Sequence, residues 1–242
     1  MRSVRFATFA VGLMLAGCAT VDSVQDPRPS DFLIHGIDVS KYQGEIDWPA
    51  ARDSGVTFAW IKATEGGDYS DAYFDRNWQA AKDAGIVRGA YHFAYWCRPA
   101  EEQVRWFEQH VPVDDTALPP VLDVEWVPTS RTCPQKVSRE RALEQMRIIL
   151  TEMERFYHKR PVIYSTVDFY RDVLDGGALS EYPIWVRSVK YYPTVKYGDR
   201  RWHFWQYTAT GRVPGIRGEV DRNAFFGNNE QWLAFLEGPN KS

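Results

Sequence analysis

The sequence predicts an α/β fold, an irregular TIM-like (β/α) barrel with about eight strands and fewer helices. Short apolar runs recur between residues 34 and 221, and several are separated by segments with a helical pattern. Repetition of strand, helix and strand implies parallel strands, and this many strands within one domain suggests a closed barrel. The later helices are too few for a regular barrel.

The candidate strands are the short apolar runs of the chain. They are residues 34–39, 57–63, 87–93, 120–124, 161–164, 183–186, 203–207 and 219–221. Two helices stand out between them. Residues 138–157 carry one apolar stripe that includes Leu143, Met146 and Leu150, and residues 71–84 stop at Gly85, a favourable residue after a helix end.

Composition points to one ordinary globular domain, which we place at residues 32–238. The 242 residues are 44% hydrophobic and 25% charged, enough apolar material for a sizeable core. The net charge of −3 gives no basic footprint for nucleic acid. The aromatic residues, 10 Trp, 13 Tyr and 13 Phe, can fill a core or line a groove.

The amino terminus has the pattern of an export signal. Arg2 and Arg5 precede an apolar run, residues 6–16, that is too short for a durable membrane span. Residues 15–18 (LAGC) resemble the bacterial lipobox, which implies that residues 1–17 are removed and Cys18 carries lipid. Residues 18–31 would then be the lipidated cysteine and a flexible tether. The alternative is a conventional signal peptide with an incidental cysteine.

This pattern predicts an exported protein, lipid-anchored to a bacterial membrane and facing the cell wall. Ala19 follows the cysteine, so the aspartate often linked to inner-membrane retention is absent. The expected site is the outer membrane if the source is Gram-negative. The remaining cysteines, Cys97 and Cys133, are expected to form a disulfide, because an even pair usually bridges under oxidising conditions. A nucleophilic cysteine is the alternative, but it lacks a nearby His-centred motif.

Residues 119–126 (PPVLDVEW) form an apolar strand that delivers two carboxylates. Side chains alternate along a strand, so Asp123 and Glu125 project from one face, as acid/base chemistry on one bond requires. A calcium ligand pair or a solvated strand end would give the same pattern. Further acids stand at the ends of other predicted strands: Asp38 ends the first, Asp221 ends the last, and Glu65 follows the second.

In a parallel barrel these strand ends meet at one mouth, where active sites lie. The first and last strands are neighbours on closure, so we expect Asp38 and Asp221 to lie side by side. A ring of acids is costly unless the carboxylates are solvated, hydrogen-bonded or share protons, which favours a functional reason for the cluster. His92 and Gln206 occupy similar strand-end positions, and His92 is expected to be a supporting hydrogen-bonding residue.

Five ordered blocks together resemble glycoside hydrolase family 25, the lysozyme-type muramidases of irregular barrel fold. The blocks are residues 36–48 (GIDVSKYQGEIDW), 61–66 (IKATEG), 89–93 (GAYHF), the strand with Asp123 and Glu125, and 205–207 (WQY) followed by 220–223 (VDRN). The resemblance covers roughly residues 34–236. Residues 185–188 (WVRS) depart from it, because many relatives carry a small residue and then an aromatic one after the tryptophan.

The resemblance implies hydrolysis of the β-1,4 bond between N-acetylmuramic acid and N-acetylglucosamine in peptidoglycan. Glu125 would be the general acid, and Asp123 would orient the substrate N-acetyl group or stabilise the charge formed when that group attacks the anomeric carbon. We favour this substrate-assisted route, with net retention, over direct attack by an aspartate. Asp38 and Asp221 are carried over as supporting acids, and a hydrogen bond to backbone is the simpler reading of each.

Several other side chains are candidates for the glycan groove, although packing would explain each equally well. They are Tyr91, Tyr164, Trp185, Gln206 and Tyr207. The motifs of zinc peptidases, serine hydrolases, nucleotide-binding loops and structural metal sites are absent, so no cofactor or metal is expected. We expect a monomer that acts on peptidoglycan strands. The alternatives are a peptidoglycan-binding protein with weak or no catalysis, or a hydrolase of another N-acetylated glycan such as chitin.

Overall fold

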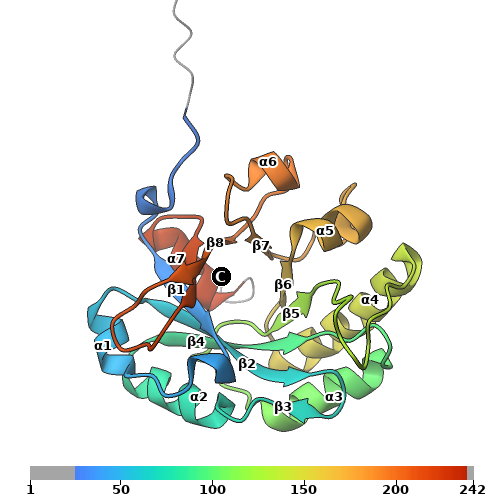
Figure 1. The fold of residues 1–242 in the computed structure, drawn as a ribbon, viewed down its shortest axis with the longest axis horizontal. Coiled ribbons are helices and arrows are strands. Elements are labelled where there is room, and N and C mark those ends of the chain that lie inside the picture. Colours follow the sequence, from blue (N-terminus) through green and yellow to red (C-terminus); the bar gives the residue numbers. More distant parts are fainter. Residues whose placement is uncertain (1–24, 239–242) are drawn as a thin grey trace, which may run out of the picture.

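The computed structural model describes residues 25–238. It shows the expected α/β barrel, in which eight strands form a closed ring (Figure 1). The strands are β1 (His35–Val39), β2 (Phe58–Glu65), β3 (Tyr69–Ser70), β4 (Val87–Phe93), β5 (Val121–Val124), β6 (Val162–Ser165), β7 (Ile184–Arg187), β8 (Phe204–Gly211) and β9 (Val220–Phe225). The ring runs β1-β2-β4-β5-β6-β7-β8-β9, and β9 pairs with β1 to close it.

Seven strands of the ring are parallel, and β9 is antiparallel to both of its neighbours. The predicted last strand at residues 219–221 was therefore wrong in extent and in implied direction. The connection 212–219 is too short for the crossover that parallel strands need, so β8 and β9 form a hairpin. Asp221 stands near the start of β9, and this start lies at the end of the barrel where the parallel strands finish. The short strand β3 pairs only with β2.

The longer helices cover one side of the barrel, and short ones cover the other (Figure 1). The helices are α1 (Trp48–Asp53), α2 (Phe74–Asp83), α3 (Ala100–His110), α4 (Arg139–Tyr157), α5 (Val167–Phe169), α6 (Thr194–Tyr197) and α7 (Asn229–Glu237), with 3₁₀-helices η1 (Pro29–Asp31) and η2 (Lys41–Gln43) and a π-helix η3 (Tyr170–Leu174). The predicted helices 71–84 and 138–157 are α2 and α4.

Local sequence signals set these helix ends. The Ser138 hydroxyl accepts a hydrogen bond from the Arg141 amide at the start of α4. Gly85 follows α2 with φ +74°, a conformation that glycine adopts without strain. Helix α3, which the sequence reading did not identify, packs against α4 and β2.

Aromatic side chains fill the barrel interior and form a floor below its carboxyl-terminal end. Trp60 stacks on Trp185, and the ring of Phe204 meets Trp60 edge-on. The small residues of two predicted motifs make room for this layer: a Cβ at Gly36 would collide with Phe58, and one at Gly89 with Trp60. Helix α7 closes the opposite end of the barrel, since its Trp232 packs on Phe58 and on Phe225. 

The amino-terminal predictions fall mainly on residues that the structure does not describe. The signal peptide, residues 1–17, and Cys18 lie outside the described residues. At the end of the expected tether, Pro29–Asp31 form η1, and the following Phe32 packs on Trp202 and Phe226. Between residues 25 and 238, no helix combines the length and apolar character needed to cross a membrane.

Candidate active site

Strand alternation places a layer of polar side chains directly above the aromatic floor. Trp185 points inward from β7, and so do residues two positions further along the strands, because side chains two apart share a face. This layer joins predicted site residues to two cations and an asparagine. It comprises Asp38, Lys62, Tyr91, Asp123, Tyr164, Arg187, Gln206, Asp221 and Asn223.

Asp38 lies at the seam that closes the barrel. It is buried, and it pairs in register with Asp221 across β1 and β9, as predicted. Its Oδ2 accepts hydrogen bonds from the side-chain amides of Gln206, at 3.0 Å, and Asn223, at 2.8 Å. Burial, followed by the nearby Asp221 carboxyl, raises the pKa of Asp38 to about 8 although these hydrogen bonds act to lower it. Asp38 is therefore mainly protonated at neutral pH.

The two amides belong to a hydrogen-bonded chain that fixes the floor of the site. The Tyr164 hydroxyl donates to Gln206 Oε1 at 3.0 Å, and the Trp185 indole N–H donates to Asn223 Oδ1 at 2.8 Å. Each amide oxygen therefore has a donor, which turns each NH₂ group toward Asp38. Asn223 was in a recognised sequence block but was not predicted as a site residue. Asn223 is two residues from Asp221 on the same strand, so its side chain had to share the face of Asp221, and this spacing could have identified it.

Asp123 and Glu125 project from one face at the end of β5. Asp123 is buried, and its Oδ1 has no hydrogen-bond partner within residues 25–238. Burial, with the neighbouring Glu125, raises the pKa of Asp123 well above its usual value. Burial also raises the pKa of the partly exposed Glu125, while Arg187 acts to lower it. Two adjacent carboxyl groups in this environment resist joint ionisation, so the pair holds a proton that can be transferred.

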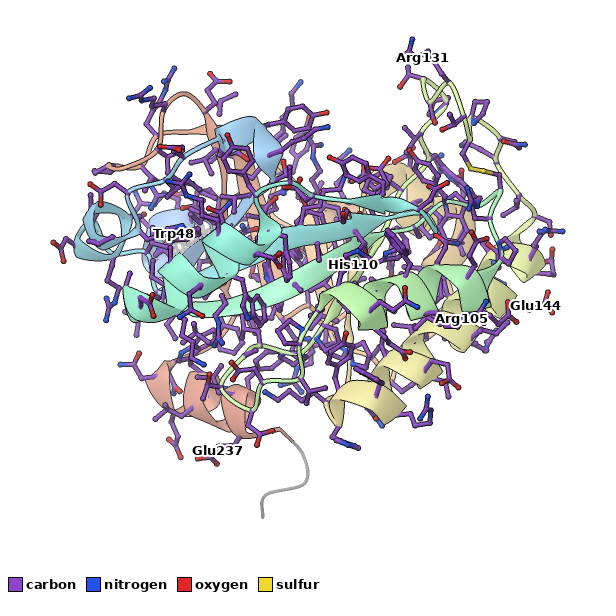
Figure 2. All side chains as sticks on the ribbon, turned by 90° about the horizontal axis from the view of Figure 1, so that it is seen from below. Trp48, Arg105, His110, Arg131, Glu144 and Glu237 are labelled. Carbon is purple, nitrogen blue, oxygen red and sulfur yellow. A yellow bond between two sulfur atoms is a disulfide. The ribbon has the colours of Figure 1, made fainter. Side chains whose placement is uncertain are left out.

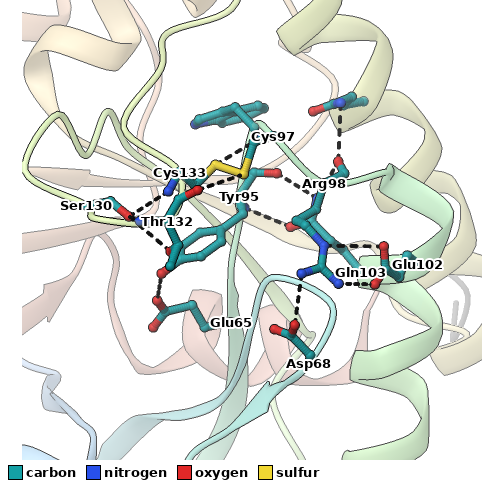
Figure 3. The surroundings of a disulfide bond; sticks show 12 residues. Glu65, Asp68, Tyr95, Cys97, Arg98, Glu102, Gln103, Ser130, Thr132 and Cys133 are labelled. Atoms are coloured by element: carbon teal, nitrogen blue, oxygen red, sulfur yellow. Dashed lines mark hydrogen bonds and ion pairs between the residues drawn. A yellow bond between two sulfur atoms is a disulfide. The ribbon is translucent and has the colours of Figure 1, made fainter.

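The backbone at Glu125 is fixed by the neighbouring loop. The Trp96 indole donates to the Glu125 carbonyl oxygen at 2.8 Å, and the next residue, Cys97, forms a disulfide with Cys133, with their Cα atoms 5.6 Å apart. This confirms the predicted bridge. It ties the loop after β4 to the loop after β5 (Figure 3). Arg131 projects from the outer end of the second loop (Figure 2).

Glu65 is the last residue of β2 but is not a partner of the acid pair. It forms an ion pair with Lys62 at 2.5 Å and accepts a hydrogen bond from the Tyr95 hydroxyl, which lies beside the disulfide (Figure 3). Burial acts to raise the pKa of Glu65, but Lys62 and Tyr95 hold it below its usual value. The side chain is therefore the counter-ion of Lys62.

His92 lies on the outer face of β4, below α3. It is fully buried, with Nδ1 2.8 Å from the Thr64 hydroxyl and Nε2 3.3 Å from Gln103 Oε1. Burial lowers the pKa of His92 to about 4, so the ring is neutral at pH 7. This agrees with the supporting role expected for His92.

The aromatic groove candidates divide between different places in the fold. Tyr91 and Tyr164 border the acids, whose charges raise the pKa of both phenols in addition to the effect of burial. Trp185 is only 2% exposed and belongs to the aromatic floor. Tyr207 is on the opposite face of β8 from Gln206, where its hydroxyl is 3.2 Å from His35 Nδ1. The placement of Trp185 and Tyr207 along a groove is therefore corrected, since strand register turns them elsewhere.

Two further observations concern ligands. Among residues 25–238, no three His, Cys, Asp or Glu side chains are arranged to hold a metal ion. A pocket of about 670 Å³ lies away from the acid pair, between η3 and α6. Arg171, Lys196, Arg200 and Arg201 contribute to its lining, and none of Asp38, Asp123, Glu125 and Asp221 does.

The model of a sequence family, glycosyl hydrolases family 25, matches residues 37–216. This chain belongs to glycosyl hydrolase family 25. The match includes Asp38, Asp123 and Glu125 and ends before Asp221, which the structure adds through the β1–β9 pairing. The protein is therefore a glycoside hydrolase.

Individual relatives support the family 25 assignment. The uncharacterized protein YegX of Escherichia coli O157:H7 is 41% identical over 216 residues, which cover 87% of this chain and 76% of YegX. Lysozyme M1 of Streptomyces globisporus is 39% identical over 215 residues, 83% of this chain and 70% of the lysozyme. The structure of a family 25 glycosyl hydrolase from Bacillus anthracis aligns with a TM-score of 0.78 at 35% identity, covering 86% of this chain and 95% of that one.

Proposed function

We propose that this family 25 enzyme is a muramidase that hydrolyses the β-1,4 bond between N-acetylmuramic acid and N-acetylglucosamine in peptidoglycan. The observation that carries the proposal is the Asp123–Glu125 pair, two inward-facing carboxyl groups whose pKa values are both raised. The similarity to a protein named lysozyme points to the same bond. The substrate is then a glycan strand of the bacterial cell wall.

Glu125 is the general acid of the proposed reaction. Burial raises its pKa, which favours the protonated form that a general acid needs, and its partial exposure gives the substrate access. Glu125 gives this proton to the glycosidic oxygen as the bond to the anomeric carbon breaks. The resulting carboxylate later removes a proton from the water that completes hydrolysis.

Asp123 positions the substrate's own nucleophile. Its buried Oδ1 has no hydrogen-bond partner among residues 25–238, so it can accept a hydrogen bond from the N–H of the 2-acetamido group. That contact directs the acetamido oxygen to the anomeric carbon, where it displaces the leaving sugar and forms a cyclic oxazolinium. Water then opens this ring from the face that the leaving group occupied, and the product keeps its β configuration.

Asp38 and its amide partners hold the side chains of the site in position. The protonated Asp38 carboxyl accepts from Gln206 and Asn223 without adding a further negative charge beside the Asp123–Glu125 pair. The aromatic floor beneath them restricts movement of the network. Asp221, at the same seam, is partly exposed and borders the substrate side of Asp38.

The direct test is digestion of purified peptidoglycan, followed by borohydride reduction and mass spectrometry of the released fragments. A muramidase leaves N-acetylmuramic acid at the new reducing end, so this sugar should be the one that borohydride reduces. Reduced N-acetylglucosamine would assign the other glycosidic bond. Turnover of chitin with none of peptidoglycan would favour the chitinase alternative, and binding without turnover would leave a binding protein.

Export and lipid anchoring at Cys18 complete the proposal, on the strength of the amino-terminal sequence pattern. The Cys97–Cys133 disulfide is in keeping with an oxidising compartment outside the cytoplasm. A membrane-held enzyme facing the wall would meet its substrate without diffusing away.

A further inference from the structure

Arg187 occupies the site at a point where the sequence departs from the resemblance to the family. It is the last residue of β7, and it shares the inward face of that strand with Trp185, one layer closer to the acids. Across the β7–β8 pair its register partner is Gln206, the residue that donates to Asp38. The backbone of Arg187 therefore lies in the barrel wall, beside the layer of polar side chains.

The backbone of Arg187 is held firmly. The Tyr197 hydroxyl donates to the Arg187 carbonyl oxygen at 2.8 Å and also contacts the Ser165 carbonyl oxygen at 3.0 Å. Tyr197 is itself 2% exposed, so this anchor is buried behind the strand. The main chain is fixed, while the side chain of Arg187 is partly exposed.

The guanidinium lies among acids but is not neutralised by close contact with any of them. Its charge acts to lower the pKa of both Glu125 and Asp221, which places it near the two carboxyl groups. Within residues 25–238, however, it forms neither an ion pair nor a side-chain hydrogen bond. The other cation of this layer differs, because Lys62 is bound to Glu65 at 2.5 Å. Arg187 thus keeps its donors for a group outside the protein.

Resting on the proposed function, we propose that Arg187 is a specificity residue that binds a carboxylate carried by the muramic acid side of the substrate. N-acetylglucosamine polymers are neutral, whereas muramic acid carries a lactyl group that ends in a carboxylate or, when amidated, in a peptide with its own carboxylates. A guanidinium matches a carboxylate with two parallel hydrogen bonds. Arg187 thereby favours muramyl glycans over chitin.

The test compares wild type with Arg187→Gln and Arg187→Lys on three substrates. These are peptide-free glycan strands with free lactyl carboxylates, the same strands after conversion of those carboxylates to methylamides, and strands that carry stem peptides. Arg105→Gln is the matched control, since Arg105 is exposed on α3 (Figure 2). For each pair, kcat and KM are measured together with the pH profile, and circular dichroism checks folding.

On the carboxylate-bearing strands, Arg187→Gln should lower kcat/KM by about 10- to 100-fold, mainly through KM, as for loss of a charged hydrogen bond. Methylamidation should lower the wild-type value by a similar factor, and the variant should lose much less on the amidated strands. Arg187→Lys should retain an intermediate value because it keeps the charge without the paired geometry. Arg105→Gln should match wild type.

The three substrates distinguish the lactyl carboxylate from the peptide carboxylates. They also distinguish failure of the proposed function from failure of the role proposed for Arg187. An effect on peptide-free strands identifies the lactyl carboxylate, and one confined to peptide-bearing strands identifies the peptide. Equal loss on charged and amidated strands, with a displaced pH profile, would overturn recognition and leave Arg187 as a modulator of Glu125. If wild type cleaves no muramyl strand, the proposed function fails; if it cleaves them and Arg187→Gln is unaffected, only this inference fails.

Discussion

Asp38 and Asp221 are paired in register across the antiparallel β1–β9 seam that closes the barrel. Burial raises the pKa of both carboxyl groups, and for Asp38 the value reaches about 8. The reversed direction of β9 brings Asp221 to this place from the start of its strand. The seam thus adds a second carboxyl pair beside Asp123 and Glu125.

Glu125→Gln should nearly abolish hydrolysis, because the amide keeps the shape of the side chain but has no proton to transfer. General acid catalysis typically contributes about 10²- to 10⁴-fold, so a loss of this size is expected in kcat. Substrate affinity and melting temperature should change little. The matched control is Glu144→Gln on the outer surface of α4 (Figure 2), which should retain full activity. More than half of wild-type turnover in Glu125→Gln would remove Glu125 from the acid role.

Asp123→Asn should be severely impaired, with a loss of at least about 100-fold in kcat, because Asp123 guides the acetamido group during its attack. A stable thiazoline analogue of the cyclic intermediate should inhibit wild type and bind this variant more weakly. Activity and inhibition are measured on the same preparations. If Asp123→Asn matched wild type while Asp221→Asn lost activity, the partner of Glu125 would have to be reassigned to the β1–β9 seam.

The raised pKa of Asp38 predicts how stability depends on pH. In the unfolded chain an aspartate titrates near 3.9, whereas the pKa of folded Asp38 is about 8, so the folded protein binds the extra proton between these values. Its contribution to stability is therefore present at low pH and is lost as pH rises through this window, at about 1.4 kcal/mol for each pH unit. The melting temperature of wild type should fall relative to that of Asp38→Asn as pH increases from 5 to 8.5, because asparagine stays neutral throughout. The exposed Asp75→Asn control should follow wild type; a slope in Asp38→Asn as steep as in wild type would contradict the assignment.

The placements in the fold that the sequence predicted were those fixed by local pattern. Asp123 and Glu125 share a face because side chains alternate along any strand, and Asp38 lies next to the carboxyl end of β1, the end at which sites form in parallel barrels. Trp185 and Tyr207 were misplaced because strand register determines which face is inward and at what height, and register depends on neighbours distant in sequence. The short 212–219 connection already contained the signal for an antiparallel β9.

The sequence-based prediction of the site also missed two long cationic side chains. Lys62 lies in residues 61–66, a block that resembles the family, and Arg187 lies in residues 185–188, which depart from it. Neither was predicted to be a site residue. Nothing in the sequence shows that Lys62 pairs with Glu65 or that Arg187 remains without an ion-pair partner in residues 25–238. Such side chains reach many positions from one Cα, so their partners become known only with the fold.

Reduction of Cys97–Cys133 should lower stability and also activity. Opening the bridge restores chain entropy to the unfolded state, worth roughly 3 to 4 kcal/mol for a loop of this size. It also frees the loop beside Trp96, whose indole holds the Glu125 carbonyl. Non-reducing peptide mapping should find both thiols bridged, and a paired Cys97→Ser and Cys133→Ser variant should melt lower and turn over more slowly. Free thiols in protein from an oxidising compartment, or unchanged activity in the variant, would contradict this prediction.

Cys18→Ser should release the enzyme from the membrane fraction or stall its processing, because the thiol is the expected site of lipid attachment. A tether of about 13 residues has a typical reach of roughly 20 Å, which lets a membrane-held barrel touch nearby glycan strands. Fractionation with metabolic labelling by a fatty acid measures both effects. A chain that begins near residue 31 should be soluble and fully active, since every catalytic side chain described above comes from the barrel. Recovery of wild type only as a soluble, unlabelled species would refute the anchor and leave simple secretion.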